Sequence, residues 1–125
     1  MLTLPRRRML KRRSDFQRVY HAGKTFANRY FVLYVFESNK LDDKVGFAAG
    51  KKLGCAVKRN RVKRLLRESY RKNQHQIKSG LALLFIGRKA AVKAKCDAVE
   101  QSFLQLGKKA GIFLAAEDAG DKKYG

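Results

Sequence analysis

The chain has 125 residues and a mass of 14.3 kDa, which is the size of one ordinary domain. Hydrophobic residues make up 45% of it, enough for a folded core, and 30 Lys and Arg residues against 10 Asp and Glu residues give a formal charge of +20 at pH 7. This charge favours a polyanionic partner, above all a nucleic acid, and argues against an enzyme built on paired carboxylates.

The sequence has no apolar run of about 18 residues, the length that a transmembrane helix needs. Its first residues, MLTLPRRRMLKRR, lack the apolar stretch that follows the charges of a secretory signal. The two cysteines, Cys55 and Cys96, are too few for a disulfide framework and are expected to be reduced. Together these features predict a cytoplasmic protein with no membrane partner, folded as a single domain over residues 1–125.

The N-terminal arm, about residues 1–13, holds six Arg and Lys residues and no acid, so we expect it to become ordered on phosphate groups. A short helix is predicted next. Ser14 is its N-cap candidate, Gln17 completes the spacing of a capping box, and Gly23 follows its end. Three residues would share one face, which on their pattern alone is an ordinary core stripe: Phe16, Val19 and Tyr20.

Aromatic and β-branched residues dominate the next segment and predict one strand over Phe26–Glu37. One face of this strand is plainly apolar and is predicted to be core: Phe31, Leu33 and Val35. The other face has three aromatic residues and suits a half-exposed surface on which bases can stack: Tyr30, Val32, Tyr34 and Phe36. The acidic pair Asp42–Asp43 is interpreted as turn chemistry rather than a metal site.

A second strand is predicted over Val45–Gly50, with a nearly flat face formed by Gly46, Ala48 and Gly50. The almost continuous apolar run LALLFIG after Gly80 predicts a third strand that is buried on both faces. Apolar spacing then predicts a helix from Ala90 to Ala110, which would bury Cys96. The Gly-rich and acidic tail, about residues 112–125, is expected to be frayed.

The densest signal is residues 51–72, which contain ten Lys and Arg residues and one acid, Glu68. A helix over 57–72 would have an apolar side made of Val62, Leu65, Leu66 and Tyr70. The opposite side would be a polar ridge made of Asn60, Arg64, Arg67 and Arg71. A helix face that is merely solvated normally mixes acids with cations, so this pattern indicates that a polyanion compensates the charge.

Residues 45–69, VGFAAGKKLGCAVKRNRVKRLLRES, closely resemble the protein subunit of bacterial ribonuclease P. The signature of that family is a small-residue strand, a Lys-Lys-x-Gly turn and a helix that opens with Arg-Asn-Arg and continues x-Lys-Arg. The sequence has each part: Lys51, Lys52, Gly54, Arg59, Asn60, Arg61, Lys63 and Arg64. The resemblance extends through DFQRVYHAG, ANRYFVLY and LLFIGRKAA and covers about residues 6–106.

The resemblance implies an α+β fold: a single-domain two-layer α/β sandwich, ribosomal protein S5 domain 2-like. Its mixed four-stranded sheet would contain a left-handed βαβ crossover through the basic helix, an exception to the usual right-handed rule. It also implies that the protein joins a catalytic RNA, which holds Mg²⁺ and removes the 5′ leader of precursor tRNA. The protein itself would have no catalytic residue, no metal ligand and no bound cofactor.

The resemblance also implies two sets of RNA-binding residues. The 5′ leader of precursor tRNA would be bound by Phe16, Tyr20, Val32, Tyr34, Ala48, Lys52, Arg59 and Asn60. The catalytic RNA would be bound by Arg59, Asn60, Arg61, Lys63, Arg64, Arg67 and Arg71. On this interpretation the stripe that contains Phe16 and Tyr20 is part of a platform for the leader.

Two other classes of function compete with this one. A protein-only nuclease needs carboxylates that converge on Mg²⁺ or a histidine-based acid/base pair. The acids are scattered, and His21 and His75 have no partner nearby in the sequence and are expected on the surface. Neither cysteine has the spacing of a zinc site. A structural RNA-binding protein of the ribosomal type has a similar composition and stays open as the alternative, separated only by the ordered set of motifs.

Overall fold

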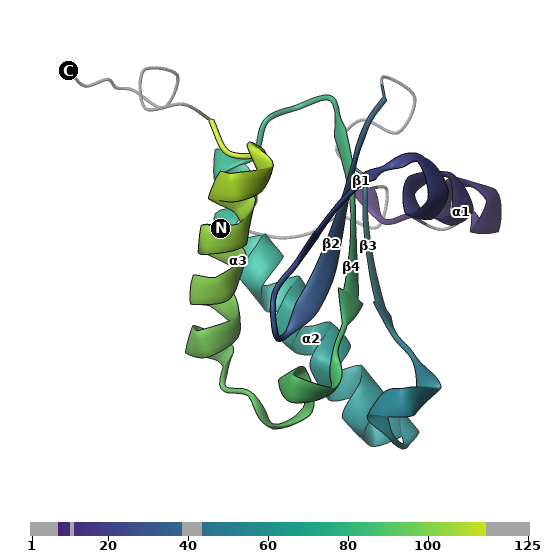
Figure 1. Cartoon of the computed structure of the whole chain (residues 1–125), viewed down its shortest axis with the longest axis vertical. Helices are drawn as coiled ribbons and strands as arrows, with labels where there is room; N and C mark the ends of the chain where they lie inside the picture. The colour runs from purple at the N-terminus through teal and green to yellow at the C-terminus, as the bar shows by residue number, and fades with distance from the viewer. Residues whose placement is uncertain (1–7, 11, 39–43, 115–125) are drawn as a thin grey trace.

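Figure 1 shows the computed structural model of the chain, which describes residues 8–10, 12–38 and 44–114. Ten elements follow one another along the chain: α1 (Arg13–Ala22), β1 (Lys24–Ala27), β2 (Phe31–Glu37), β3 (Val45–Ala49), the 3-10 helix η2 (Lys51–Leu53), α2 (Ala56–Asn73), η3 (Gln74–Gln76), β4 (Leu81–Gly87), η4 (Lys89–Lys93) and α3 (Cys96–Ala110). No helix among these is long and apolar enough to cross a membrane.

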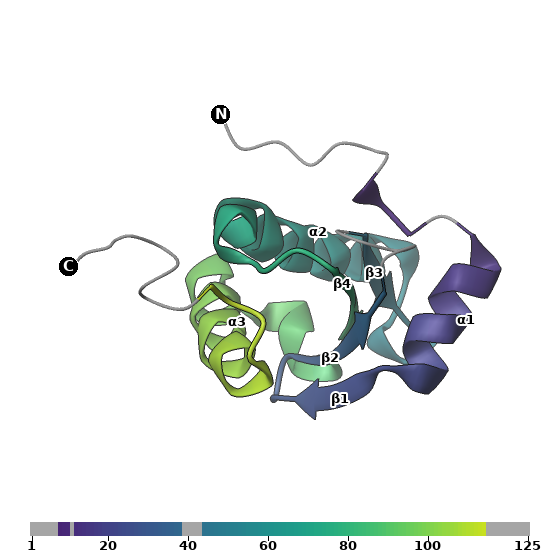
Figure 2. The same cartoon turned by 90° about the horizontal axis from the view of Figure 1, so that it is seen from above.

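The four strands form one mixed sheet in the order β1-β2-β4-β3. Strands β1, β2 and β4 pair antiparallel, whereas β3 runs parallel to β4. Helices α2 and α3 cover one face of the sheet, and α1 lies against the other (Figure 2). Because α2 connects the parallel strands β3 and β4, the predicted βαβ crossover runs through the basic helix. The predicted single domain with a mixed four-stranded sheet is therefore confirmed.

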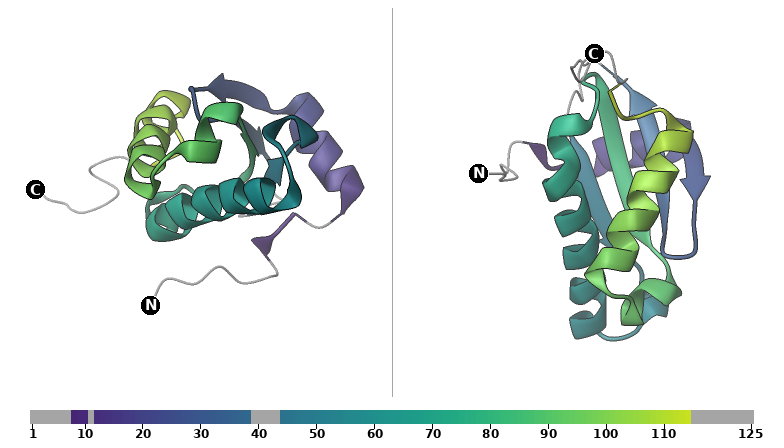
Figure 3. Two further views of the ribbon diagram at one scale, coloured as in Figure 1. Left: turned by 90° about the horizontal axis from the view of Figure 1, so that it is seen from below. Right: turned by 90° about the vertical axis from the view of Figure 1, so that its left-hand side faces the viewer.

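The main core lies between the sheet and the layer of α2 and α3, which pack side by side (Figure 3). The apolar side of α2 reaches this core through Val62, Leu66 and Tyr70, as its spacing predicts. The predicted inward face of β2 is also confirmed: Phe31, Leu33 and Val35 are buried. A smaller cluster on the other side of the sheet contains Val19, Ala82 and Leu84.

The single strand predicted over Phe26–Glu37 is wrong, because the chain turns back at residues 28–30 and forms the hairpin β1–β2. The side-chain oxygen of Asn28 accepts hydrogen bonds from the N–H groups of Tyr30 (2.8 Å) and Phe31 (2.9 Å). An Asn side chain that bonds the backbone in this way makes a turn within an otherwise strand-like sequence. Tyr30 therefore lies at the turn and packs against the main core instead of joining the face of Tyr34.

The starts of α1 and α3 also differ from the prediction. Helix α1 begins at Arg13, with Arg12 as its N-cap, so Ser14 lies in the first turn and forms no capping box. Its end is as predicted, since the Gly23 N–H donates to the Val19 carbonyl at 3.0 Å. The helix predicted from Ala90 is interrupted, because Ala94 adopts an extended conformation between η4 and α3.

The two ends of the described chain are attached to the sheet and the helices. Met9 forms a parallel bridge to Val45, and the Leu10 N–H donates to the Val45 carbonyl at 2.8 Å. Arg8 donates to the Tyr70 hydroxyl and to the Gln74 side chain, both at 2.8 Å. At the other end, Ile112 is buried, and the Leu114 N–H donates to the Gln76 carbonyl at 2.8 Å. The rest of the predicted arm and tail, and the pair Asp42–Asp43, lie outside the described residues.

A close approach between β4 and α2 gives the first prediction. A Cβ at Gly87 would collide with Cγ1 of the buried, stiff Val62 side chain, whereas a Cβ at Gly50 would meet nothing within 4 Å. Gly87→Ala should therefore lower the free energy of unfolding by about 1–3 kcal/mol. Gly50→Ala should change it by no more than about 0.5 kcal/mol. Urea denaturation of both variants is the measurement, and equal midpoints would contradict the packing described.

Candidate nucleic-acid interface

Helix α1 covers only part of its face of the sheet and leaves an apolar row beside it. Val19 of α1 packs against Ala82 and Leu84 of β4. One step further along β4, the register places Val32 of β2, Ile86 of β4 and Ala48 of β3 next to one another. All three side chains are half-exposed. The row is therefore a nearly flat surface, which runs across three strands and is accessible to a ligand.

Two tyrosines border this row on the side of α1. Tyr20 is 43% exposed, and its ring centroid lies 5.0 Å from that of Tyr34, which follows Val32 on the same face of β2. Burial, and then the nearby Tyr20 hydroxyl, raise the pKa of Tyr34, so its phenol is neutral around pH 7. Phe16 is half-buried and packs against the cluster of Val19. The two tyrosines thus present uncharged ring surface next to the apolar row.

Cations border the row at the end of β3. The chain leaves this strand at Ala49 and passes through η2 into α2, at the lower end of the molecule in Figure 1. Lys52 in η2 and Asn60 in α2 are exposed, and Arg59 is half-exposed. The Nε atom of Arg59 is buried and is an unsatisfied donor among the described residues. The resemblance implies that these three residues bind the leader, and they follow the carboxyl end of β3, the strand that contributes Ala48 to the row.

The middle of α2 carries the outward-facing ridge. Arg64 and Arg67 are exposed, Lys63 is half-buried, and the Arg67 guanidinium lies 5.8 Å from the ring centroid of Phe47. Within the described part of the chain, neither Arg64 nor Arg67 forms an ion pair. No acid among the described residues therefore pairs with either charge, which is the property expected of a surface that binds phosphates.

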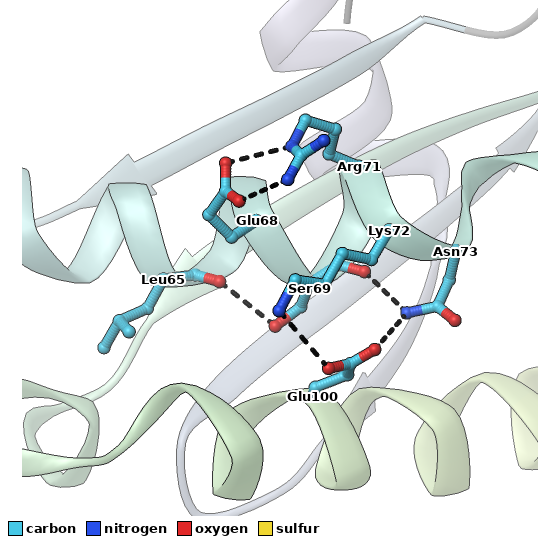
Figure 4. Close-up of polar contacts among 7 residues, drawn as sticks. All are labelled: Leu65, Glu68, Ser69, Arg71, Lys72, Asn73 and Glu100. Carbon is cyan, nitrogen blue, oxygen red and sulfur yellow. Dashed lines mark hydrogen bonds and ion pairs between the residues drawn. The ribbon is translucent and has the colours of Figure 1, made fainter. Parts of the chain in front are cut away.

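The last turns of α2 differ, because acids meet the cations there (Figure 4). Glu68 accepts two hydrogen bonds from Arg71, at 2.7 and 3.1 Å. These bonds lower the pKa of Glu68 below its ordinary value. Arg71 was predicted as a ridge residue equivalent to Arg64 and Arg67, but its guanidinium is engaged by this carboxylate. The uncompensated part of the ridge thus ends near Arg67.

Helix α3 contributes a second acid to the same region. The buried Asn73 side chain donates to the Ser69 carbonyl at 2.8 Å and to Glu100 at 3.0 Å, and the other Glu100 oxygen lies 3.9 Å from the Lys72 ammonium (Figure 4). These contacts join the end of α2 to α3. Because the polar groups at this end of α2 are occupied by contacts within the protein, the candidate interface comprises only the first two-thirds of α2.

Arg61, the second arginine of the Arg-Asn-Arg motif, points toward the protein. Its guanidinium donates to the backbone carbonyls of Val92 at 2.6 Å and Ala94 at 2.8 Å. The resemblance grouped Arg61 with the residues that would bind the catalytic RNA, although helical spacing did not place it on the outward-facing ridge. Sequence analysis also missed Ile86, which only the strand register places between Val32 and Ala48.

The described residues hold no group of three or more His, Cys, Asp or Glu side chains able to bind a metal ion. His21 is exposed and lies 2.9 Å from the Gln17 side chain, and His75 is also exposed. Cys55 is an exposed free thiol at the start of α2, where the backbone N–H of Lys58 lowers its pKa. Cys96 is free as well and is half-exposed rather than buried.

Comparisons with known proteins identify the family of the chain. The family model described as Ribonuclease P matches residues 4–111. The ribonuclease P protein component of Alkaliphilus oremlandii is 38% identical over 107 residues, which are 86% of this chain and 94% of that protein. The corresponding protein of Clostridioides difficile is 40% identical over 106 residues, 84% of this chain and 93% of its own length.

Solved structures give the same result. The RNase P protein of Staphylococcus aureus superimposes with a TM-score of 0.76 and 32% identity, over 86% of this chain and 98% of that one. The RNase P protein of Thermotoga maritima gives a TM-score of 0.71 and 30% identity, over 81% and 96% of the two chains. Fold, sequence and the order of the motifs therefore favour this family over a ribosomal protein, and the chain belongs to the ribonuclease P protein family.

Proposed function

We propose that this chain is the protein component of a ribonucleoprotein that removes the 5′ leader of precursor tRNA in the cytoplasm. In this proposal the catalytic RNA binds along α2, and the leader lies on the sheet face beside α1. The observation that carries the proposal is the apolar row of Val32, Ile86 and Ala48, which tyrosines border on one side and cations on another.

The proposed leader surface combines the two features that single-stranded RNA needs. The exposed ring of Tyr20, which lies beside the ring of Tyr34, provides a stacking surface for an unpaired base, and Phe16 packs below against the cluster of Val19. Beyond the row, Lys52 and Arg59 supply positive charge for the phosphates, and Asn60 supplies an amide that can donate or accept a hydrogen bond. The small side chain of Ala48 keeps the floor low between these borders, whereas Gly46 is buried beneath the Leu10 side chain.

The proposed surface for the catalytic RNA is the ridge of α2. Arg64 and Arg67 face solvent without an ion pair among the described residues, and Asn60 and Lys63 continue the same helix toward its start. Arginine suits this role because its planar guanidinium can bind a phosphate through two hydrogen bonds. Arg71 would contribute less, since Glu68 already binds it. Arg59 lies between the two surfaces and is proposed to serve both.

In this proposal the chemistry of cleavage belongs to the catalytic RNA, which would hold the Mg²⁺ ions. The described part of the protein has no carboxylate cluster that would bind such ions. The contribution of the protein is then to bind and orient two RNA molecules relative to each other. A single helix with a cationic outer side and a neighbouring stacking surface is sufficient for that task.

Salt dependence tests the electrostatic part of the proposal. If about five to eight cations neutralise phosphates, the logarithm of the association constant for the catalytic RNA should fall with log[salt] with a slope of about −4 to −7. Arg64→Gln with Arg67→Gln should reduce the steepness by about 2. The matched control is Lys108→Gln with Lys109→Gln, exposed cations near the end of α3, which should leave the slope unchanged. A wild-type slope near zero would refute the electrostatic account.

Precursor discrimination tests the leader surface. Tyr20→Ala and Tyr34→Ala should each reduce the ratio of precursor to mature tRNA affinity in the holoenzyme by about 5- to 150-fold, because one base stack is worth about 1–3 kcal/mol. Tyr20→Phe and Tyr34→Phe keep the rings and should preserve the ratio. The arginine variants should weaken assembly with the catalytic RNA instead. Because the Tyr34 ring is half-buried, thermal melts must show that Tyr34→Ala is still folded. If both alanine variants are folded and keep the wild-type ratio of precursor to mature tRNA affinity, the proposed leader surface is wrong.

A third test concerns catalysis. The purified protein, freed of RNA with micrococcal nuclease, should not cleave precursor tRNA, and activity should appear when the catalytic RNA and Mg²⁺ are added after the nuclease is inactivated. A protein variant with both Arg64→Gln and Arg67→Gln serves as a control for assembly. Cleavage by the RNA-free protein would show that a protein active site exists.

A further inference from the structure

Arg61 is held inside the protein by the segment that follows β4. Its Nη1 donates to the Val92 carbonyl at 2.6 Å and lies 3.5 Å from the Ala91 carbonyl, and its Nη2 donates to the Ala94 carbonyl at 2.8 Å. Ala91 and Ala94 are buried, and the Arg61 side chain is half-buried. The final carbonyl groups of a short helix lack partners within it, so a cation with two forked donors is well suited to satisfy them.

The segment that Arg61 holds is itself cationic. Lys89 and Lys93 of η4 are exposed, and Lys95 just after it is exposed as well. The segment packs against both α2 and η2, the 3-10 helix that carries Lys51 and Lys52. In Figure 1, η4 and the start of α2 both lie at the lower end of the molecule. The bonds from Arg61 therefore set where the lysines of η4 stand relative to the proposed RNA-binding surface.

We propose that Arg61 is a positioning residue rather than a phosphate contact. It fixes η4 against α2, and Lys89 and Lys93 then extend the cationic surface of η2 and α2 along the phosphate backbone of the bound RNA. This inference rests on the proposed function, because it assumes that the cationic surface binds RNA. It assigns the three residues of Arg-Asn-Arg to different tasks: Arg59 and Asn60 face the RNA, and Arg61 arranges a neighbouring segment.

The chemistry of the contact predicts which substitutions it tolerates. A lysine keeps the positive charge of Arg61, but its single ammonium group lacks the planar fork that bridges the Val92 and Ala94 carbonyls. Glutamine has no charge, but its amide can still donate to one carbonyl. Arg61→Met should therefore release η4, whereas Arg61→Lys and Arg61→Gln can each keep one of the two bonds and should both retain part of its order. A direct phosphate contact predicts instead that lysine, which keeps the charge, is a clearly better replacement than glutamine.

The experiment measures binding of the full-length protein to the catalytic RNA as a function of salt. Lys89→Gln with Lys93→Gln should reduce the steepness of the salt slope by about 2 in the wild-type background. In the Arg61→Met background the same pair should produce no further change, because those lysines no longer stand beside the RNA. Hydrogen exchange of the Ala91 and Ala94 amides, which bond within η4, should be faster in Arg61→Met than in wild type.

Three results would overturn the inference. The first is an additive loss, in which the lysine pair changes the slope equally in both backgrounds. The second is a wild-type slope and affinity in Arg61→Lys together with a large loss in Arg61→Gln, which would make the charge alone decisive. The third is a lower melting temperature of Arg61→Met with an unchanged slope, as a purely structural role predicts. If the wild-type protein binds the catalytic RNA without salt dependence, it is the proposed function that fails.

Discussion

The packing of α2 against the sheet is the interaction on which the rest of the structure depends. This helix connects the parallel strands β3 and β4, so its position fixes their order and closes the main core. Its outer side has cations that repel one another, and the burial of Val62, Leu66 and Tyr70 on the inner side must offset that repulsion before any RNA is bound. The absent side chain at Gly87 lets the helix approach β4 closely enough for this burial.

Much of this fold could be predicted because the apolar residues of its strands and helices recur at regular spacings. The alternation of Phe31, Leu33 and Val35 with Val32 and Tyr34 identified the two faces of β2, and a 3.6-residue spacing identified the apolar side of α2. The errors have local causes that no periodicity reveals. A side-chain oxygen at Asn28 bends an apolar run into a hairpin, and an extended residue at Ala94 interrupts an apolar pattern that continues on both sides of it.

The candidate site was predictable as a set of residue types but not as an arrangement. The sequence marked Tyr20, Tyr34 and the basic helix, yet the contact between the two rings depends on how α1 lies on β2. Ile86 joins the apolar row only through the pairing of β4 with both neighbours. The cations of α2 look alike in sequence, but Arg61 meets carbonyls, Arg71 meets Glu68, and Arg64 faces solvent. The groups that each arginine contacts, rather than its spacing along the helix, therefore distinguish the roles of these residues.

The attachment of the N-terminal residues to β3 also has a consequence for the behaviour of the protein before it meets RNA. Strand β3 is at one edge of the sheet, where unpaired backbone groups can recruit a strand from another molecule. The Met9 bridge and the Leu10 bond occupy this edge at Val45, and the Leu10 side chain covers Gly46. The same short segment therefore protects the sheet against intermolecular β-pairing, and a chain shortened past Leu10 loses this protection together with its basic arm.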